Sequence, residues 1–152
     1  MRDIHHFIGG ASAPGTSGQW SDVFDPNTGT VQARVQLATI AEVDAAIANA
    51  AAAQPAWAAT NPQRRARVMF DFKRLIERDM NALAELLSAE HGKVIADSKG
   101  DIQRGLEVIE FACGIPHLLK GDYTGGAGPG IDVYSMRQAL GVVAGITPFN
   151  FP

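Results

Sequence analysis

The sequence is poor in cysteine, in excess charge of either sign and in long apolar runs. Cys113 is the one cysteine among 152 residues, so no internal disulfide can form and a reducing compartment is expected. The 13 basic and 16 acidic residues are scattered and give a net charge of −3, which argues against nucleic acid or an anionic membrane as the main partner. No apolar stretch approaches the roughly 18 residues of a membrane-spanning helix, and the N-terminus lacks a targeting pattern. We therefore expect a cytoplasmic protein with no nucleic-acid or membrane partner.

Metal-binding and nucleophilic patterns are also scarce. His5 and His6 are adjacent, so a strand would point them to opposite faces, and no cluster of further ligands lies nearby. Cys113 belongs to an apolar stripe of a helix that is predicted to begin near Lys93, so we expect a packed core thiol and not a nucleophile. The sequence thus predicts no metal site.

The stretch with the clearest chemical meaning is the last one, GVVAGITPFNFP, from Gly141 to Pro152. Its short apolar run stops at Thr147-Pro148, which is typical of a buried strand that ends in a loop. Ligands of open α/β sheets bind in loops of this kind, and the flanking prolines would hold Asn150 rigidly. The local pattern alone leaves open a simpler interpretation, in which Asn150 bonds its own backbone in a turn.

The first third of the chain predicts short strands and then a helix. Turn residues divide residues 4–38, with a loop at 11–18, and a strand at 31–37 alternates apolar and polar residues, which predicts one buried and one wet face. Thr39 and Glu42 form a capping box that opens an Ala-rich helix. We expect this helix to pack on something flat and to be interrupted at Pro55.

Two further helices are predicted before the one that carries Cys113. Asn61-Pro62 provides a cap and a proline in the first turn, Asp79 can cap a following helix, and Gly92 can end it. Inside the helix that begins near Lys93, Gly100 and Gly105 suggest that another backbone passes close by.

A glycine-rich stretch separates these helices from the final run. Residues 121–130 predict a flexible loop, and their glycines lack the spacing of a phosphate-binding motif. Residues 131–140 predict a strand without a strong apolar face.

Four segments together resemble the aldehyde dehydrogenase superfamily: RRARVMFDFKRLIE, SAEHGKVIADSKGDIQRGLEVIEFA, GIPHLLKGDY and PFNFP. They occur in the order and at about the spacing found in that superfamily, and they correspond to the first third of a complete member. Phe149, where most members have Trp, narrows the resemblance to the CoA-acylating methylmalonate-semialdehyde dehydrogenases.

The resemblance implies an α/β fold of the aldehyde dehydrogenase type, of which this chain would be the N-terminal portion. Residues 1–120 would form the N-terminal part of the NAD-binding domain, and residues 121–140 a loop and a bridging strand used in oligomerisation. Residues 141–152 would form the first strand and loop of a Rossmann-like sheet, and the ending is expected to be a truncation.

The implied activity is NAD-dependent oxidation of malonate or methylmalonate semialdehyde to an acyl-CoA with loss of carbon dioxide, in valine and inositol catabolism. NAD is the implied cofactor, CoA a co-substrate, a small aldehyde the substrate, and a homo-oligomer the expected full-length state. In the family a cysteine thiolate attacks the aldehyde; that cysteine would lie beyond Pro152, so the chain alone is expected to be inactive.

Particular residues match the family's functional positions. Ile146, Thr147, Pro148 and Phe149 would contact NAD, and Asn150 would supply the amide of the oxyanion hole. Arg104 would bind the substrate carboxylate.

The residues alone favour an exposed ladder of ion pairs among Asp101, Arg104 and Glu107. Two other functions stay open: a non-acylating aldehyde dehydrogenase with a different substrate, and an inactive helical interaction module.

Overall fold

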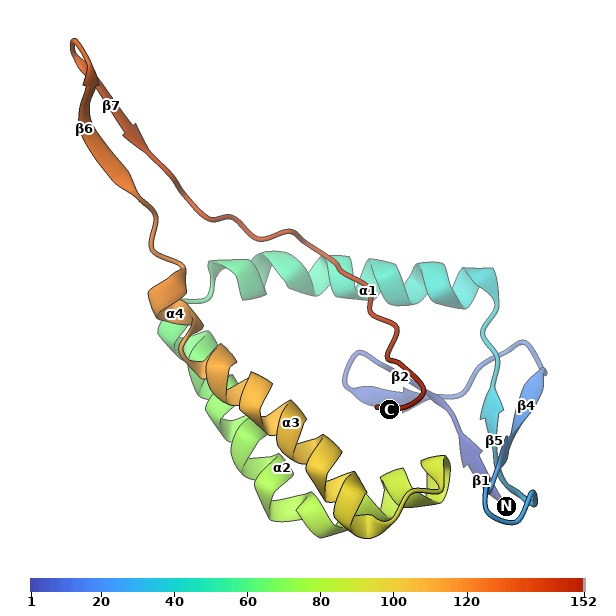
Figure 1. The fold of residues 1–152 in the computed structure, drawn as a ribbon. Helices are drawn as coiled ribbons and strands as arrows, with labels where there is room; N and C mark the ends of the chain where they lie inside the picture. The colour runs from blue at the N-terminus through green and yellow to red at the C-terminus, as the bar shows by residue number, and fades with distance from the viewer. Residues whose placement is uncertain (152) are drawn as a thin grey trace.

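The computed structural model describes residues 1–151, which form a β-rich N-terminal part, a set of helices and a projecting hairpin (Figure 1). The strands are β1 Arg2–Ile4, β2 His6–Ile8, β3 Ala11–Ala13, β4 Trp20–Phe24, β5 Val31–Gln36, β6 Tyr123–Gly128 and β7 Ile131–Tyr134. The helices are α1 Ile40–Ala59, α2 Pro62–His91, α3 Ile95–Cys113 and α4 Ile115–Leu118. Within the described residues, none of the helices combines the length and apolar character needed to span a membrane.

The N-terminal part contains the short strands that the sequence predicts. Strand β5 lies between β1, which runs parallel to it, and β4, which runs antiparallel, while β2 and β3 form a separate antiparallel pair. The predicted loop at residues 11–18 is wrong at its start, because residues 11–13 are paired as β3.

The predicted wet face of β5 is wrong at Gln36, which is buried. Its Oε1 accepts a hydrogen bond of 2.6 Å from the Gly15 N–H and lies 3.1 Å from His5 Nδ1, and its Nε2 donates to the Gly15 carbonyl at 2.7 Å. A side-chain amide can be buried here because these partners satisfy it.

Helix α1 begins at the predicted capping box but does not stop at Pro55. The Thr39 hydroxyl accepts from the Glu42 N–H at 3.2 Å, and the Glu42 carboxylate accepts from the Thr39 N–H at 2.7 Å. The same carboxylate accepts from the Thr16 N–H, and these backbone donors lower the pKa of Glu42 to about 2. The prediction of an interruption is wrong because the loss of one N–H at Pro55 is offset by the alanine-rich sequence around it. The flat packing surface predicted for α1 is also missing among the described residues, because the helix buries none of its side chains.

Helix α2 is one continuous element of 30 residues, so the predicted break at Asp79 is wrong. Asp79 instead accepts hydrogen bonds from the preceding Arg78 at 2.7 and 2.9 Å, on the helix surface. The predicted end is confirmed, since Gly92 takes a left-handed φ of 86° and its N–H bonds the Ser88 carbonyl.

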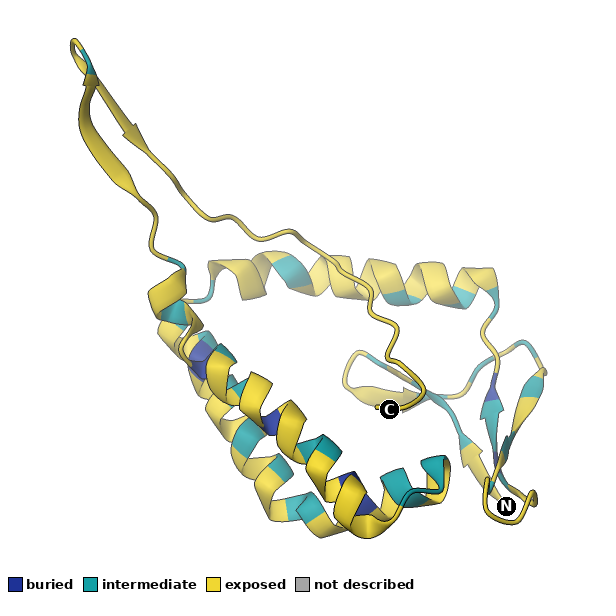
Figure 2. Cartoon of the chain, in the orientation of Figure 1, coloured by how far each residue is buried: buried dark blue, intermediate teal, exposed yellow. Residues whose placement is uncertain are grey.

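The main core lies where α2 and α3 run side by side (Figure 2). Ala84 and Ser98 are both 0% exposed, so small side chains let the two helices approach closely, and the Ser88 and Ser98 hydroxyls are 2.7 Å apart. Cys113 is buried at the far end of α3, which confirms the prediction of a packed thiol. Gly100 and Gly105 have open space, within the described residues, on the side where a Cβ would project, so the close backbone expected there is not found.

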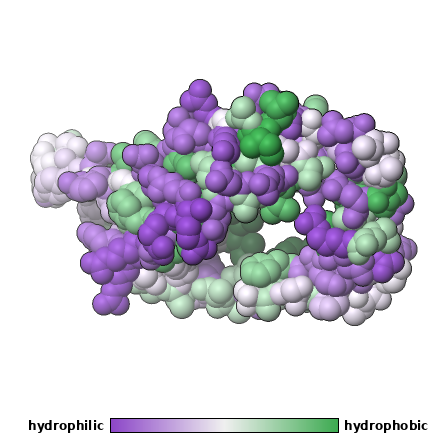
Figure 3. All heavy atoms as spheres, turned by 90° about the horizontal axis from the view of Figure 1, so that it is seen from below, coloured by the Kyte–Doolittle hydropathy of each residue, from purple (hydrophilic) through white to green (hydrophobic). Residues whose placement is uncertain are grey.

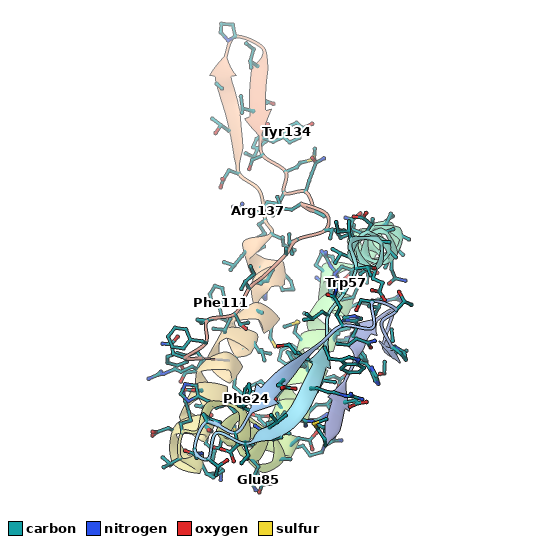
Figure 4. All side chains as sticks on the ribbon, turned by 90° about the vertical axis from the view of Figure 1, so that its right-hand side faces the viewer. Phe24, Trp57, Glu85, Phe111, Tyr134 and Arg137 are labelled. Atoms are coloured by element: carbon teal, nitrogen blue, oxygen red, sulfur yellow. The ribbon has the colours of Figure 1, made fainter. Side chains whose placement is uncertain are left out.

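The glycine-rich stretch is not a flexible loop. Residues 123–128 pair with β7 as an antiparallel hairpin that projects from the helices (Figure 1). Tyr134 at the end of β7 lies away from both Trp57 of α1 and Phe111 of α3 (Figure 4). The predicted strand at residues 131–140 is confirmed only as far as Tyr134, because the residues beyond it have no partner strand in the described chain.

The predicted strand at residues 142–146 does not form. Val143 is 74% exposed, Ile146 is fully exposed, and the segment is not paired with any described strand. A β-strand needs the backbone of a neighbour for its hydrogen bonds, and no described strand lies beside this segment. Other apolar side chains are also at the surface, including some beside an opening seen from below (Figure 3).

Candidate functional site

Asn150 lies in a turn at the end of the extended segment that follows the hairpin. The Phe151 N–H donates to the Pro148 carbonyl at 3.3 Å, which closes the turn around Phe149 and Asn150. Pro148 has a fixed φ, so the entry to the turn is restricted. Pro152, the second proline of the predicted motif, lies outside the described residues. In the described chain no protein group bonds the Asn150 side-chain amide, so the alternative in which this amide bonds its own backbone is not observed.

Lys93 holds this turn against the start of α3. Its Nζ donates to the Asn150 carbonyl at 3.1 Å and lies 5.2 Å from the centre of the Phe151 ring. The same ammonium pairs with Asp101 of α3, and both side chains are only 14% exposed. Sequence reasoning missed Lys93, because the contact joins residues 57 positions apart and no local pattern signals it.

A cavity of about 940 Å³ lies next to the turn. Its walls are mostly apolar side chains of α2 and α3, and residues of β1 and Phe151 also line it. The residues that matter for chemistry are Arg2, Asp3, Glu90, Asp101 and Arg104. A largely apolar cavity with a few converging polar groups is the usual setting of a small-molecule site.

Arg104 lines this cavity from α3 and keeps an accessible guanidinium. It is 74% exposed, and its one ion pair among the described residues is with Glu107, 2.9 Å away and 51% exposed. The predicted ladder is therefore half right, because Asp101 turns to Lys93 instead of Arg104. An exposed pair of this kind is weak, so the guanidinium can exchange Glu107 for another carboxylate.

The four residues predicted to contact NAD directly precede Asn150, and all four are exposed to solvent: Ile146, Thr147, Pro148 and Phe149. Ile146 is fully exposed and Phe149 is 90% exposed, so both offer apolar surface to a flat ring, and Thr147 adds a hydroxyl beside them. These residues fit one wall of a dinucleotide site. The Gly-rich phosphate cradle of such a site is not among them.

A second, smaller cavity of about 690 Å³ lies at the other end of α2 and α3. Arg67, Cys113, His117 and Lys120 are among the residues that line it. Within residues 1–151, no three His, Cys, Asp or Glu side chains gather in a way that could hold a metal ion.

The sequence pattern of the aldehyde dehydrogenase family matches residues 13–152. The chain belongs to the aldehyde dehydrogenase family. This confirms the resemblance predicted from the sequence, and with it the α/β fold class of an aldehyde dehydrogenase N-terminal portion.

Curated aldehyde dehydrogenase relatives carry semialdehyde names. The chain is 45% identical, over all of its length, to the malonate-semialdehyde dehydrogenase of Pseudomonas aeruginosa, of which it covers 30%. It is 44% identical over 146 residues to the human mitochondrial methylmalonate-semialdehyde/malonate-semialdehyde dehydrogenase [acylating], with 96% of this chain and 27% of that protein covered. The chain thus spans less than a third of the length of these relatives.

Solved aldehyde dehydrogenase structures share this fold over nearly the whole chain. A protein of Sinorhizobium meliloti 1021, described as a methylmalonate-semialdehyde dehydrogenase and crystallised with NAD, is 61% identical with a TM-score of 0.96, over 100% of this chain and 31% of that one. The methylmalonate-semialdehyde dehydrogenase of Oceanimonas doudoroffii is 46% identical with a TM-score of 0.95, over 99% and 31%.

Proposed function

We propose that this chain is the N-terminal portion of an NAD-dependent, CoA-acylating dehydrogenase of malonate or methylmalonate semialdehyde. The names of its relatives support the substrate class, and the word acylating in the human relative's name supports CoA as co-substrate. The observation that carries the proposal is that Arg104 and Phe151, the residue that follows Asn150, line one cavity.

Arg104 would select the substrate. A semialdehyde of this class has a carboxylate at one end, and an exposed guanidinium can grip it with two parallel hydrogen bonds. Arg104 is suited to this role because its present partner is an exposed glutamate that a substrate can displace.

Asn150 would stabilise the other end of the substrate. When a thiolate adds to the aldehyde carbon, the carbonyl oxygen gains negative charge, and an amide N–H₂ placed beside it stabilises that charge. The Asn150 amide has no partner in residues 1–151, so its two N–H donors are available for this purpose.

Ile146, Thr147, Pro148 and Phe149 would form one wall for the nicotinamide cofactor, with the apolar Ile146 and Phe149 against its flat ring. NAD, when bound, accepts the hydride that leaves the substrate carbon. The task of this wall is to orient that ring and to exclude water from it.

We further propose that the dehydrogenase is a cytoplasmic homo-oligomer and that residues 1–152 alone turn over no aldehyde. Cys113 is buried at the end of α3 away from the cavity of Arg104, so it cannot supply the thiolate that the chemistry needs there. Formation of NADH by the purified chain with malonate semialdehyde, CoA and NAD would contradict this.

The test uses the enzyme that carries this segment. NADH formation is measured with malonate semialdehyde, methylmalonate semialdehyde and propanal, with and without CoA, and acyl-CoA is quantified by mass spectrometry. Acyl-CoA from the semialdehydes supports the proposal. Release of a free acid without CoA would favour a non-acylating enzyme, and no turnover of any aldehyde would favour an interaction module.

The role of Asn150 is tested in the same assay. Asn150→Ala should lower kcat on the order of 10²–10³-fold with NAD affinity nearly unchanged, since an oxyanion donor acts as charge develops. Asn81→Ala, an exposed substitution on α2, is the matched control. A rise in KM for the aldehyde with kcat intact would show that Asn150 is a ground-state contact instead.

A further inference from the structure

The ion pair of Lys93 and Asp101 differs from every other ion pair in residues 1–151. Both of its side chains are 14% exposed, whereas each of the other pairs has at least one side chain that is more than a third exposed. An enclosed pair is screened less by salt and has fewer alternative geometries than a surface pair. Lys93 therefore has a defined position, set by its partner on α3.

Lys93 holds the backbone carbonyl of Asn150 as well as the carboxylate of Asp101. The Lys93 ammonium has three donors, of which one reaches Asp101 and another the Asn150 carbonyl at 3.1 Å. The Phe151 ring lies 5.2 Å from the same nitrogen, at the range of a cation–π contact. Three features of the turn are thus restrained: Pro148 by its ring, the Asn150 carbonyl by Lys93, and Phe151 by its N–H bond to Pro148.

We propose that Lys93 is a positioning residue for Asn150: it fixes the peptide plane after Asn150, and so the direction from which the Asn150 amide meets the substrate oxygen. This inference rests on the proposed role of Asn150 as an oxyanion donor. Geometry in such sites must be kept to about 0.5 Å, and a displacement of about 1 Å can cost on the order of 10²-fold in rate.

The arrangement also links the two ends of the substrate. Asp101 and Arg104 are three residues apart on α3, so they are neighbours on one helical turn. The turn of α3 that presents Arg104 to the substrate carboxylate therefore also anchors, through Asp101 and Lys93, the loop that presents Asn150. The distance between carboxylate recognition and oxyanion stabilisation is set by one rigid element.

The first arm of the test measures the turn directly by residue-resolved hydrogen–deuterium exchange in the enzyme that carries this segment, read at the Phe151 amide of residues 147–151, whose N–H bonds the Pro148 carbonyl. Lys93→Met should raise exchange there at least tenfold, while exchange at the Leu106 core of α3 stays unchanged. Lys99→Met, which changes an exposed lysine of α3, is the matched control. It should change exchange neither in the turn nor in the α3 core. Unchanged exchange at residues 147–151 in Lys93→Met, with the α3 core intact, would overturn the proposal.

The second arm is kinetic. Lys93→Met should lower kcat on the order of tenfold or more with KM for NAD nearly unchanged, and Lys93→Arg, which keeps a charged donor on a larger side chain, should recover part of the loss. In a double-substitution cycle, Lys93→Met should cost nothing further once Asn150→Ala is present, since Lys93 acts through Asn150. Additive losses would show that Lys93 acts in another way and would overturn the proposal.

The oxyanion role of Asn150 and the positioning role of Lys93 can be refuted independently of each other. If Asn150→Ala leaves kcat intact, the oxyanion role of Asn150 is wrong, whereas the exchange arm still decides whether Lys93 holds the turn. If Lys93→Met does not fold, Asp101→Asn removes the partner charge at nearly constant volume, and it should raise exchange at residues 147–151 by the same mechanism. A folded Asp101→Asn enzyme with unchanged exchange there would overturn the proposal.

Discussion

Arg104→Leu separates substrate recognition from surface electrostatics, because Arg104 lines the cavity and has an exposed glutamate as its partner. Its ion pair with Glu107 has side chains 74% and 51% exposed, and pairs of this kind contribute about 0–1 kcal/mol to stability. The substitution should therefore change the free energy of unfolding by less than about 1 kcal/mol. If Arg104 grips the substrate carboxylate, the same change should raise KM for malonate semialdehyde at least tenfold, which is about 1.4 kcal/mol of lost binding.

The assay compares two aldehydes in the enzyme that carries this segment. Propanal has no carboxylate, so its KM should change little in Arg104→Leu, whereas the KM of malonate semialdehyde should rise. Arg74→Leu is the matched control, because Arg74 also pairs three residues away on an exposed helix face, with Asp71 at 3.6 Å. Equal effects on the two aldehydes, or equal effects of Arg74→Leu and Arg104→Leu, would refute the reasoning.

Three further predictions concern the stability of the chain, each measured by thermal melting. Gln36→Leu should destabilise by about 1–3 kcal/mol, because it leaves the half-buried N–H and carbonyl of Gly15 without partners; an unchanged melt would mean that water replaces them. Gly92→Ala should cost about 1–2 kcal/mol, because φ is 86° and a Cβ would lie 2.9 Å from the Pro26 ring; full stability would refute the strain. Glu42, whose pKa falls from 4.5 to about 2 on folding, adds stability above pH 4.5 that is lost as the pH drops toward 2. The difference in melting temperature between the wild type and Glu42→Gln should shrink over that interval, and a constant difference would contradict the assignment.

Elements with local signals were predicted correctly from the sequence. The capping box of Thr39 and Glu42 needs only four adjacent residues, and Gly92 needs only its own φ, so both are encoded in the segment itself. Errors arose where a local signal competed with its surroundings. Pro55 did not end α1, because the alanine-rich sequence around it favours the helix. Asp79 did not begin a new helix, because the apolar stripe of α2 continues past it.

Elements that depend on a partner could not be predicted from one sequence. The run at residues 142–146 has the composition of a buried strand, but a strand forms only beside another backbone, and none of the described elements provides one. The hairpin of β6 and β7 shows the converse, because a glycine-rich segment becomes a strand when a partner follows it directly in the chain.

The candidate site divides in the same way. Arg104 and Asn150 were predicted from the resemblance to the aldehyde dehydrogenases, and their roles stay predictions. The contact that holds the Asn150 turn against α3 was not predicted, because Lys93 lies 57 residues from Asn150 and pairs with Asp101, which the sequence had assigned to Arg104. That reassignment has a chemical consequence. If Asp101 paired with Arg104, the guanidinium would be held by two carboxylates and would bind a substrate carboxylate weakly. Because Lys93 pairs with Asp101, Arg104 has one exposed partner, Glu107, which a substrate carboxylate can replace. The same lysine that bonds the turn of Asn150 therefore leaves the Arg104 guanidinium available to a substrate.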